Sequence, residues 1–360
     1  MTSKTGKRLL MVFLSAWMVA GCVSIGPRNV AVDRFDYSAA ISDSWKQQML
    51  LNLVKTRYGD TPVFLEVASV ISQYSLETEA NLGASWETPL KSNANTLSVG
   101  GSAVYTDRPT ITYNPLTGEK FARSLMTPIQ PLTILSMIQA GYPVAIIFRL
   151  SVQSINGVKN RYGGPARTHG ADPGFYPLIE KLGRLQAAGE LRIQVHSEKD
   201  KTYATLILRR NVGGPIEKDI SDVRNILGLD PKVDEYRVSY GSFASSNREI
   251  AILSRSVMEI MVDLASTIEV PAEHVAEKRV NPTFRDKTAE GRPVAPLIRI
   301  HSSADKPLDA FAAVPYHDRW FWIDDKDHMS KNVFSSMVFI FLLTETGTEQ
   351  GAPIVTIPAG

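Results

Sequence analysis

Little in the sequence points to disulfide bonds or to nucleic acid. Only one cysteine, Cys22, occurs in the 360 residues, so the chain cannot form an internal disulfide bond. The sequence also has almost no excess of positive or negative charge, because 39 Lys and Arg balance 37 Asp and Glu. Proteins bind nucleic acid largely by neutralising phosphates, so we expect no nucleic acid partner. The 44% share of hydrophobic residues is typical of a globular protein with its own core.

The familiar catalytic signatures are missing as well. The sequence contains no Gly-x-Gly-x-x-Gly fingerprint, no Walker loop and no Gly-x-Ser-x-Gly elbow. Ser303-Ala304-Asp305-Lys306 has the Ser-x-x-Lys spacing of penicillin-binding enzymes, whose mechanism needs the serine and lysine one helical turn apart. Here the motif precedes Pro307 in an expected loop, and the only Lys-Thr-Gly lies at residues 4–6. We therefore expect no cofactor and no catalytic centre of these kinds.

The first 22 residues have the layout of an export signal. Three basic residues within the first eight precede an apolar run at residues 9–20. A run of this length is too short to cross a bilayer core of about 30 Å as a helix, so it indicates a signal peptide. Val19-Ala20-Gly21-Cys22 resembles the lipobox of bacterial lipoproteins, although that family more often has Leu at the position of Val19. The resemblance implies cleavage before Cys22 and attachment of palmitate or similar acyl chains to that residue.

Cleavage and acylation would place the protein in the cell envelope. Loss of residues 1–21 leaves 36 basic and 37 acidic side chains, a net charge of −1. Several acyl chains hold a protein to a membrane firmly, whereas one chain gives only marginal binding. Val23 stands after the cysteine in place of Asp, and by resemblance to lipoprotein sorting rules this favours the outer membrane of a diderm bacterium. We expect a lipid-anchored protein that faces the periplasm.

The order of local patterns predicts an α+β fold of mixed helices and antiparallel strands, with a long amphipathic β-hairpin near the N-terminus. Six parts follow along the chain: a signal peptide (1–21), a lipidated tether (22–38), a helix plus long hairpin (39–127), an α+β core (128–270), a charged linker or large loop (271–296) and a C-terminal α+β segment packing on the core (297–360).

Caps and stop signals predict particular helices and strands. A helix begins after Ser42 and ends at Gly59, where a local ion pair between Arg57 and Asp60 is favoured over a ligand site. Asp172 and Ser254 are the expected N-caps of two further helices. Residues 145–155, 297–300, 312–316, 320–323 and 354–357 are expected strands, and residues 327–344 a helix.

Residues 74–87 alternate strictly between apolar and polar side chains over 14 residues, and residues 97–106 continue the pattern. This period of two predicts two long strands joined by the polar loop 88–95, followed by a short third strand at 111–113. The hairpin residues expected to meet a partner or a membrane are Tyr74, Leu76, Leu82, Trp86, Leu97, Val99 and Tyr105.

Two interpretations of the hairpin stay open. A transmembrane β-strand needs about 9–11 residues with alternating faces and aromatic ends, which residues 74–87 provide. Several protomers could then each contribute the 74–105 hairpin to a β-barrel pore. A long amphipathic hairpin lying on the core or on a partner is favoured, because Thr, Ala and Gly make its apolar face weak.

A second candidate surface lies at residues 316–328, where Tyr316, His317, Trp320, Trp322, Asp325 and His328 occur together. His with Asp could hold zinc or act as a general base, which would suit a periplasmic hydrolase. The favoured interpretation uses no metal: His317 and Asp318 form a hairpin turn and Asp327 caps the next helix. Adjacent aromatics on a strand point to opposite sides, so one face here is available to a ligand or partner.

Four segments, at residues 51–62, 108–113, 152–157 and 320–325, resemble a widespread group of uncharacterised bacterial envelope lipoproteins. The resemblance implies an envelope location and no particular activity. The sequence therefore predicts an outer-membrane-anchored periplasmic lipoprotein that acts as a binding or assembly component of an envelope complex, with a protein partner or a homo-oligomer. The alternatives are an oligomeric pore and a hydrolase; a non-enzymatic role is favoured.

Overall fold

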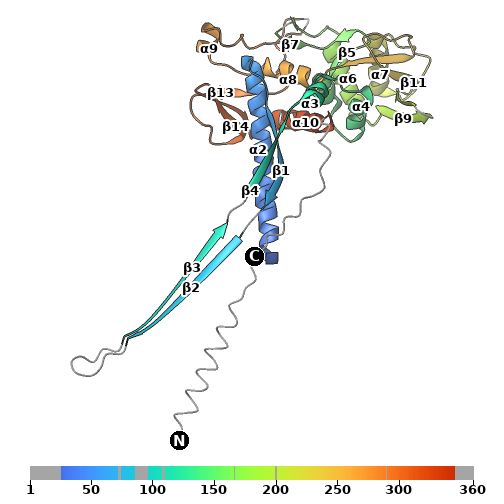
Figure 1. Cartoon of the computed structure of the whole chain (residues 1–360). Coiled ribbons are helices and arrows are strands. Elements are labelled where there is room, and N and C mark those ends of the chain that lie inside the picture. Colours follow the sequence, from blue (N-terminus) through green and yellow to red (C-terminus); the bar gives the residue numbers. More distant parts are fainter. Residues whose placement is uncertain are drawn as a thin grey trace, which may run out of the picture. The chain divides into compact units, whose positions relative to one another are not determined.

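A computed structural model of the chain describes residues 26–71, 74–85, 96–107, 110–165, 167–198, 201–288 and 290–344 (Figure 1). The chain divides into two compact units, residues 1–49 and 50–360. Helices and mostly antiparallel sheets alternate along the second unit, which confirms the α+β class. Cys22 and residues 354–357 lie outside the described residues. None of the described helices combines the length and the apolar character that a membrane crossing requires.

The first described helix, α2 (Gly26–Tyr58), is much longer than expected. The sequence predicted a tether up to residue 38 and a helix start after Ser42, and both boundaries were wrong. Residues 34–48 are mostly exposed and none of them is fully buried. Hydrophobic periodicity is weak where a helix buries little of its surface, so it did not reveal the N-terminal turns. Near the other end Leu50, Leu53 and Val54 are fully buried.

Four strands follow α2 and pair in two steps. Strand β1 (Phe64–Ile71) pairs antiparallel with β4 (Thr110–Leu116), and β2 (Tyr74–Ser85) pairs antiparallel with β3 (Thr96–Asp107), in register from Tyr74 opposite Asp107 to Ser85 opposite Thr96 (Figure 1). The period-two pattern located β2, β3 and part of β4 but missed β1. The hairpin's side chains, and Trp86 with the loop 86–95, lie outside the described residues, so its amphipathic character stays a prediction.

A six-stranded sheet forms the centre of the region that we call the body, residues 119–344. Its order is β6-β5-β12-β11-β10-β9, and within it only β11 and β12 are parallel. The strands are β5 (Val152–Ile155), β6 (Val158–Lys159), β9 (Arg192–Glu198), β10 (Lys201–Ile207), β11 (Glu235–Tyr240) and β12 (Glu249–Ser254).

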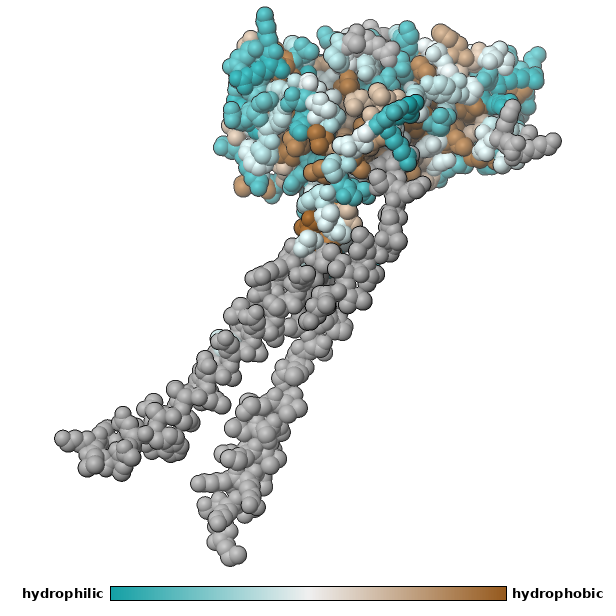
Figure 2. All heavy atoms as spheres, in the orientation of Figure 1, coloured by the Kyte–Doolittle hydropathy of each residue, from teal (hydrophilic) through white to brown (hydrophobic). Residues whose placement is uncertain are grey.

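Helices cover one face of this sheet (Figure 1). They are α4 (Pro131–Gln139), α5 (Val144–Ser151), α6 (Phe175–Ala187) and α7 (Gly214–Leu227). Side chains from all four meet those of β10, β11 and β12 around an internal space of only about 20 Å³, so this layer is the packed core. The visible surface of the body, by contrast, mixes hydrophilic and hydrophobic residues (Figure 2).

The expected strand at 145–155 was wrong, because residues 144–151 form helix α5 and only the last four residues of the segment enter the sheet. The run is apolar throughout and almost entirely buried. A fully buried helix and a fully buried strand have the same continuous apolar pattern, so periodicity cannot separate them.

Two expected N-caps were also wrong. Helix α6 begins at Phe175, and the Asp172 carboxylate instead accepts a hydrogen bond from the Lys159 main-chain N–H at 2.8 Å. Helix α8 (Val257–Ala265) is capped by Ser256, whose side chain and that of Glu259 form a reciprocal capping box. The capping box fixes the start of α8, because it satisfies two main-chain N–H groups at the helix end at once.

The C-terminal part of the body contains a three-stranded sheet of order β13-β15-β14 and helix α10 (His328–Thr344). The strands are β13 (His301–Ser303), β14 (Ala310–Tyr316) and β15 (Arg319–Asp324). Residues 297–300 are irregular, so the expected strand there was wrong, although Leu297, Ile298 and Ile300 are buried.

Residues 271–296 are mostly irregular and include helix α9 (Ala272–Ala276). His274 and Asp286 within them are buried. The segment is therefore a large loop that packs on the rest of the body.

Candidate functional site

The paired strands β1 and β4, which we call the ribbon, expose apolar side chains. Leu65 lies opposite Pro115, Val67 opposite Tyr113 and Val70 opposite Ile111. Residues directly opposite one another share a face, and the bulge between Val67 and Ser69 keeps Val67 and Val70 on the same one. Leu65, Ile111 and Tyr113 are 40, 42 and 51% exposed, so the ribbon presents an apolar face to its surroundings.

At its base the ribbon is anchored to the body by aromatic stacking. The buried ring of Phe64 stacks on Phe341 of α10, with ring centroids 4.7 Å apart. The edge of Phe121, from α3 (Glu119–Met126), approaches the same ring at 5.8 Å. These contacts attach the first residue of β1 and leave Leu65, Ile111 and Tyr113 exposed.

The residues predicted at 316–328 are distributed along the β14–β15 hairpin. His317 and Asp318 have φ angles of 45° and 62° and connect the two strands, which confirms the predicted turn. Asp325 and His328 lie beyond the other end of β15. The histidines therefore sit at opposite ends of a six-residue strand and do not converge on one reaction site.

The acidic and histidine side chains after β15 have local partners. Asp325 pairs with Lys331 at 2.8 Å, and His328 lies 3.1 Å from the Asn332 amide nitrogen. The Asp327 carboxylate accepts from the Ser330 main-chain N–H at 3.0 Å, as expected of a helix cap. Within the part of the chain that the structure describes, no group of three His, Cys, Asp or Glu side chains is arranged to hold a metal.

The aromatic residues of β15 divide between two sides of the strand. Phe321 is fully buried, whereas Trp320 and Trp322 are half-buried on the other side. Lys306 lies 5.4 Å from the Trp320 ring centroid, and His301 packs on Trp322 at 4.8 Å. The alternation predicted from the sequence is confirmed, and each tryptophan already contacts another side chain of the body.

Tyr58, at the end of α2, contacts residues that are far from it in the sequence. Its ring lies 5.3 Å from the rings of both Tyr316 and His317, and its hydroxyl is 2.8 Å from Nδ1 of His274. Asp60 accepts a hydrogen bond from Tyr316, and Arg57 donates from Nη2 to the Asn281 carbonyl at 2.6 Å. The predicted ion pair between Arg57 and Asp60 was therefore wrong, because distant segments supply a partner for each.

The Ser-x-x-Lys motif at residues 303–306 does not form a helical turn. Ser303 ends β13, and its hydroxyl donates to the Asp305 carbonyl at 2.8 Å. The motif lacks the geometry of the penicillin-binding enzymes, as its place before Pro307 suggested.

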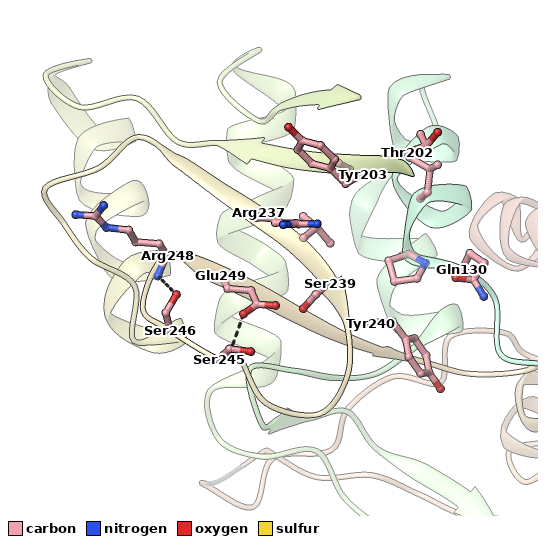
Figure 3. A pocket seen from close by; sticks show the side chains of 14 residues that line it. Gln130, Thr202, Tyr203, Arg237, Ser239, Tyr240, Ser245, Ser246, Arg248 and Glu249 are labelled. Atoms are coloured by element: carbon pink, nitrogen blue, oxygen red, sulfur yellow. Dashed lines mark hydrogen bonds between the residues drawn. The ribbon is translucent and has the colours of Figure 1, made fainter. Parts of the chain in front are cut away.

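A polar cavity of about 550 Å³ lies beside β10, β11 and β12, and sequence reasoning missed it (Figure 3). The guanidinium of Arg237 lies 4.8 Å from the Tyr203 ring centroid, and Glu249 accepts from the Ser245 main-chain N–H at 2.8 Å. Hydrogen bonds from Ser239 and Ser245 hold the pKa of Glu249 below its usual value. The lining comes from three separate segments, residues 130–132, 202–204 and 237–249, so no local motif indicates it.

No protein-family model, curated protein or solved structure matches the chain.

Proposed function

We propose that this protein is an outer-membrane-anchored periplasmic lipoprotein that acts as an assembly component of the envelope, and that copies of the chain associate through the ribbon and its continuation in β2 and β3. The observation that carries the proposal is the exposed apolar face of the ribbon. An isolated two-stranded sheet is marginally stable in water, and a third strand or a packed face is needed for independent stability.

The edges of the ribbon support the same conclusion. Within the described residues β1 pairs only with β4, and β2 only with β3, so each pair keeps two outer edges. A strand edge carries unpaired N–H and C=O groups that can pair with another chain. The 8 residues of β1 and 12 of β2 amount to roughly 66 Å of strand at about 3.3 Å per residue.

A second copy of the chain is the simplest partner for the ribbon. Every copy has the same apolar face and the same edges, so pairing needs no other gene product. Acylation at Cys22 would confine all copies to one membrane surface and raise their local concentration, which favours association without any new contact.

The mass of the acylated full chain, purified in mild detergent, tests this proposal. We expect an oligomer in wild type and a shift toward monomer when Val67→Ser and Tyr113→Ser are combined, because the apolar face is lost. Phe243→Ser is the matched control, since Phe243 is 77% exposed but lies in the body. A wild-type monomer, or an equal shift in the control, would contradict the proposal.

A pore is the second candidate. The observation that favours it is the length of β2 and β3, 12 residues each, compared with the 9–11 or so that a membrane-crossing strand needs. The full chain should then produce conductance steps in a planar bilayer, and deletion of residues 74–107 should abolish them. An oligomer without conductance would support assembly alone.

A further inference from the structure

A second cavity, of about 600 Å³, lies at the C-terminal end of α2, between β7 (Tyr162–Gly164) and the loop 278–285. Four cationic side chains line it: Arg57, Lys278, Arg279 and Arg285. Its lining includes no Asp or Glu. We call it the cationic cavity. Its volume falls within the range of about 300–1,000 Å³ that is typical of small-molecule sites.

The charges of this cavity are mostly not neutralised by the protein. Arg279 pairs with Glu277 at 2.6 Å. In the described part of the chain, no carboxylate pairs with Arg57, Lys278 or Arg285. Arg57 makes its hydrogen bond to the Asn281 carbonyl, which carries no net charge, and its Nε is buried without a partner. Burial lowers the pKa of Arg57, so a counter-anion would relieve the cost of keeping it charged.

The hydroxyl groups of the lining are already engaged within the protein. Four hydroxyls donate to main-chain carbonyls at 2.6–3.0 Å, those of Thr56, Thr168, Ser266 and Thr283. The Gly163 main-chain N–H donates to Asp263 at 2.9 Å. A neutral sugar would need free donors and acceptors in balance. Besides the Asn281 side-chain amide, the groups that remain to contact a ligand are positively charged donors, which suit a ligand that only accepts hydrogen bonds.

We propose that the cationic cavity binds a phosphate group, either as the free ion or as part of a phosphate ester. Guanidinium groups match phosphate oxygens in geometry, and charge-assisted hydrogen bonds are about twice as strong as neutral ones. Three unpaired cations exceed what one carboxylate needs and suit a dianion. This site is independent of the ribbon and of the assembly proposed above.

Isothermal titration of the full chain in neutral detergent at low salt tests the site with three probes: inorganic phosphate, glycerol 3-phosphate and acetate. We expect both phosphate probes to bind and acetate to bind at least about tenfold more weakly. Arg57→Gln and Arg285→Gln should each lower phosphate affinity about tenfold, because each removes a hydrogen bond to a charged group worth about 1.5–3 kcal/mol. Arg285 is exposed, so its variant tests the site even if Arg57→Gln folds poorly.

Arg292→Gln is the matched control, because this arginine is 77% exposed and lies outside the cavity lining. Its phosphate affinity should stay within about twofold of wild type. Tighter binding of glycerol 3-phosphate would identify an ester as the ligand, and equal binding would identify the free ion. Absence of binding by either phosphate probe, acetate binding of equal strength, or an equal loss in Arg292→Gln would overturn the proposal.

Discussion

The centre of the body and the ribbon treat polar and apolar groups in opposite ways. In the body, charged side chains are buried with partners: the Asp263 carboxylate lies 3.0 Å from Arg161 and 3.1 Å from Arg255, and the Arg255 side chain is only 1% exposed. In the ribbon, apolar side chains such as Tyr113, which is 51% exposed, face the surroundings. The buried charges of the body thus have partners within one chain, whereas the ribbon leaves apolar side chains exposed.

Breaking the buried ion pairs should have the largest effect on stability. Asp263→Ala leaves Arg161 and Arg255 without their carboxylate, and the loss of one partner from a buried pair lowers the free energy of unfolding by about 3–5 kcal/mol. Urea denaturation followed by circular dichroism measures it. Glu290→Ala is the control, because Glu290 meets Arg292 on the exposed surface and its variant should keep the wild-type midpoint. Equal midpoints for both variants would show that the Asp263 network adds nothing.

Acid should weaken the body through a second pair that lies between α6 and α7. A hydrogen bond from Arg184 lowers the pKa of Asp219 from its usual 3.8 to about 2. Since the folded-state pKa is the lower one, the bond's contribution is fully present above about pH 4 and is lost as the pH falls toward 2. Asp219→Asn should cost about 1 kcal/mol at pH 7 and flatten the stability profile between pH 4 and 2. An unchanged slope in that interval would argue against this pair.

The smallest effect on stability is expected in the ribbon itself. Tyr113→Ser alone should change the free energy of unfolding of the monomeric chain by no more than about 0.5 kcal/mol, because the side chain is already 51% exposed. Thermal unfolding at concentrations too low for association measures it. A loss of several kcal/mol would mean that the ribbon already belongs to the folded core, and the contrast with the body would fail.

Sequence patterns succeeded where one element buries or pairs a regular face. The alternation at residues 74–87 located β2, and the helix expected at residues 327–344 agrees with α10 to within one residue. They failed at the start of α2, whose residues 34–41 are mostly exposed, and at 145–151, where a buried helix has the pattern of a buried strand. Hydrophobic periodicity indicates an element when one of its faces is buried and another is exposed. It gives no signal when the whole element is buried or the whole element is exposed.

The candidate sites were harder to predict than the elements. The sequence singled out His317, Asp325 and His328 because they are close along the chain, yet a strand separates the first from the others. The cationic cavity was not foreseen, since it joins Arg57 to residues more than two hundred positions later. At residues 57–60 the sequence favoured a local ion pair over a ligand site, because the cationic partners of Arg57 lie far along the chain.

By itself the sequence determined the local periodicities, namely the alternating strands and the apolar faces of several helices. These follow from neighbours along the chain, which share one backbone geometry. Only the tertiary structure decided that β11 and β12 run parallel and that four cations line one cavity. It also decided that Arg57 and Asp60 bind partners in distant segments and not each other. Long-range contacts of this kind depend on how whole elements pack, and no short window of residues encodes that.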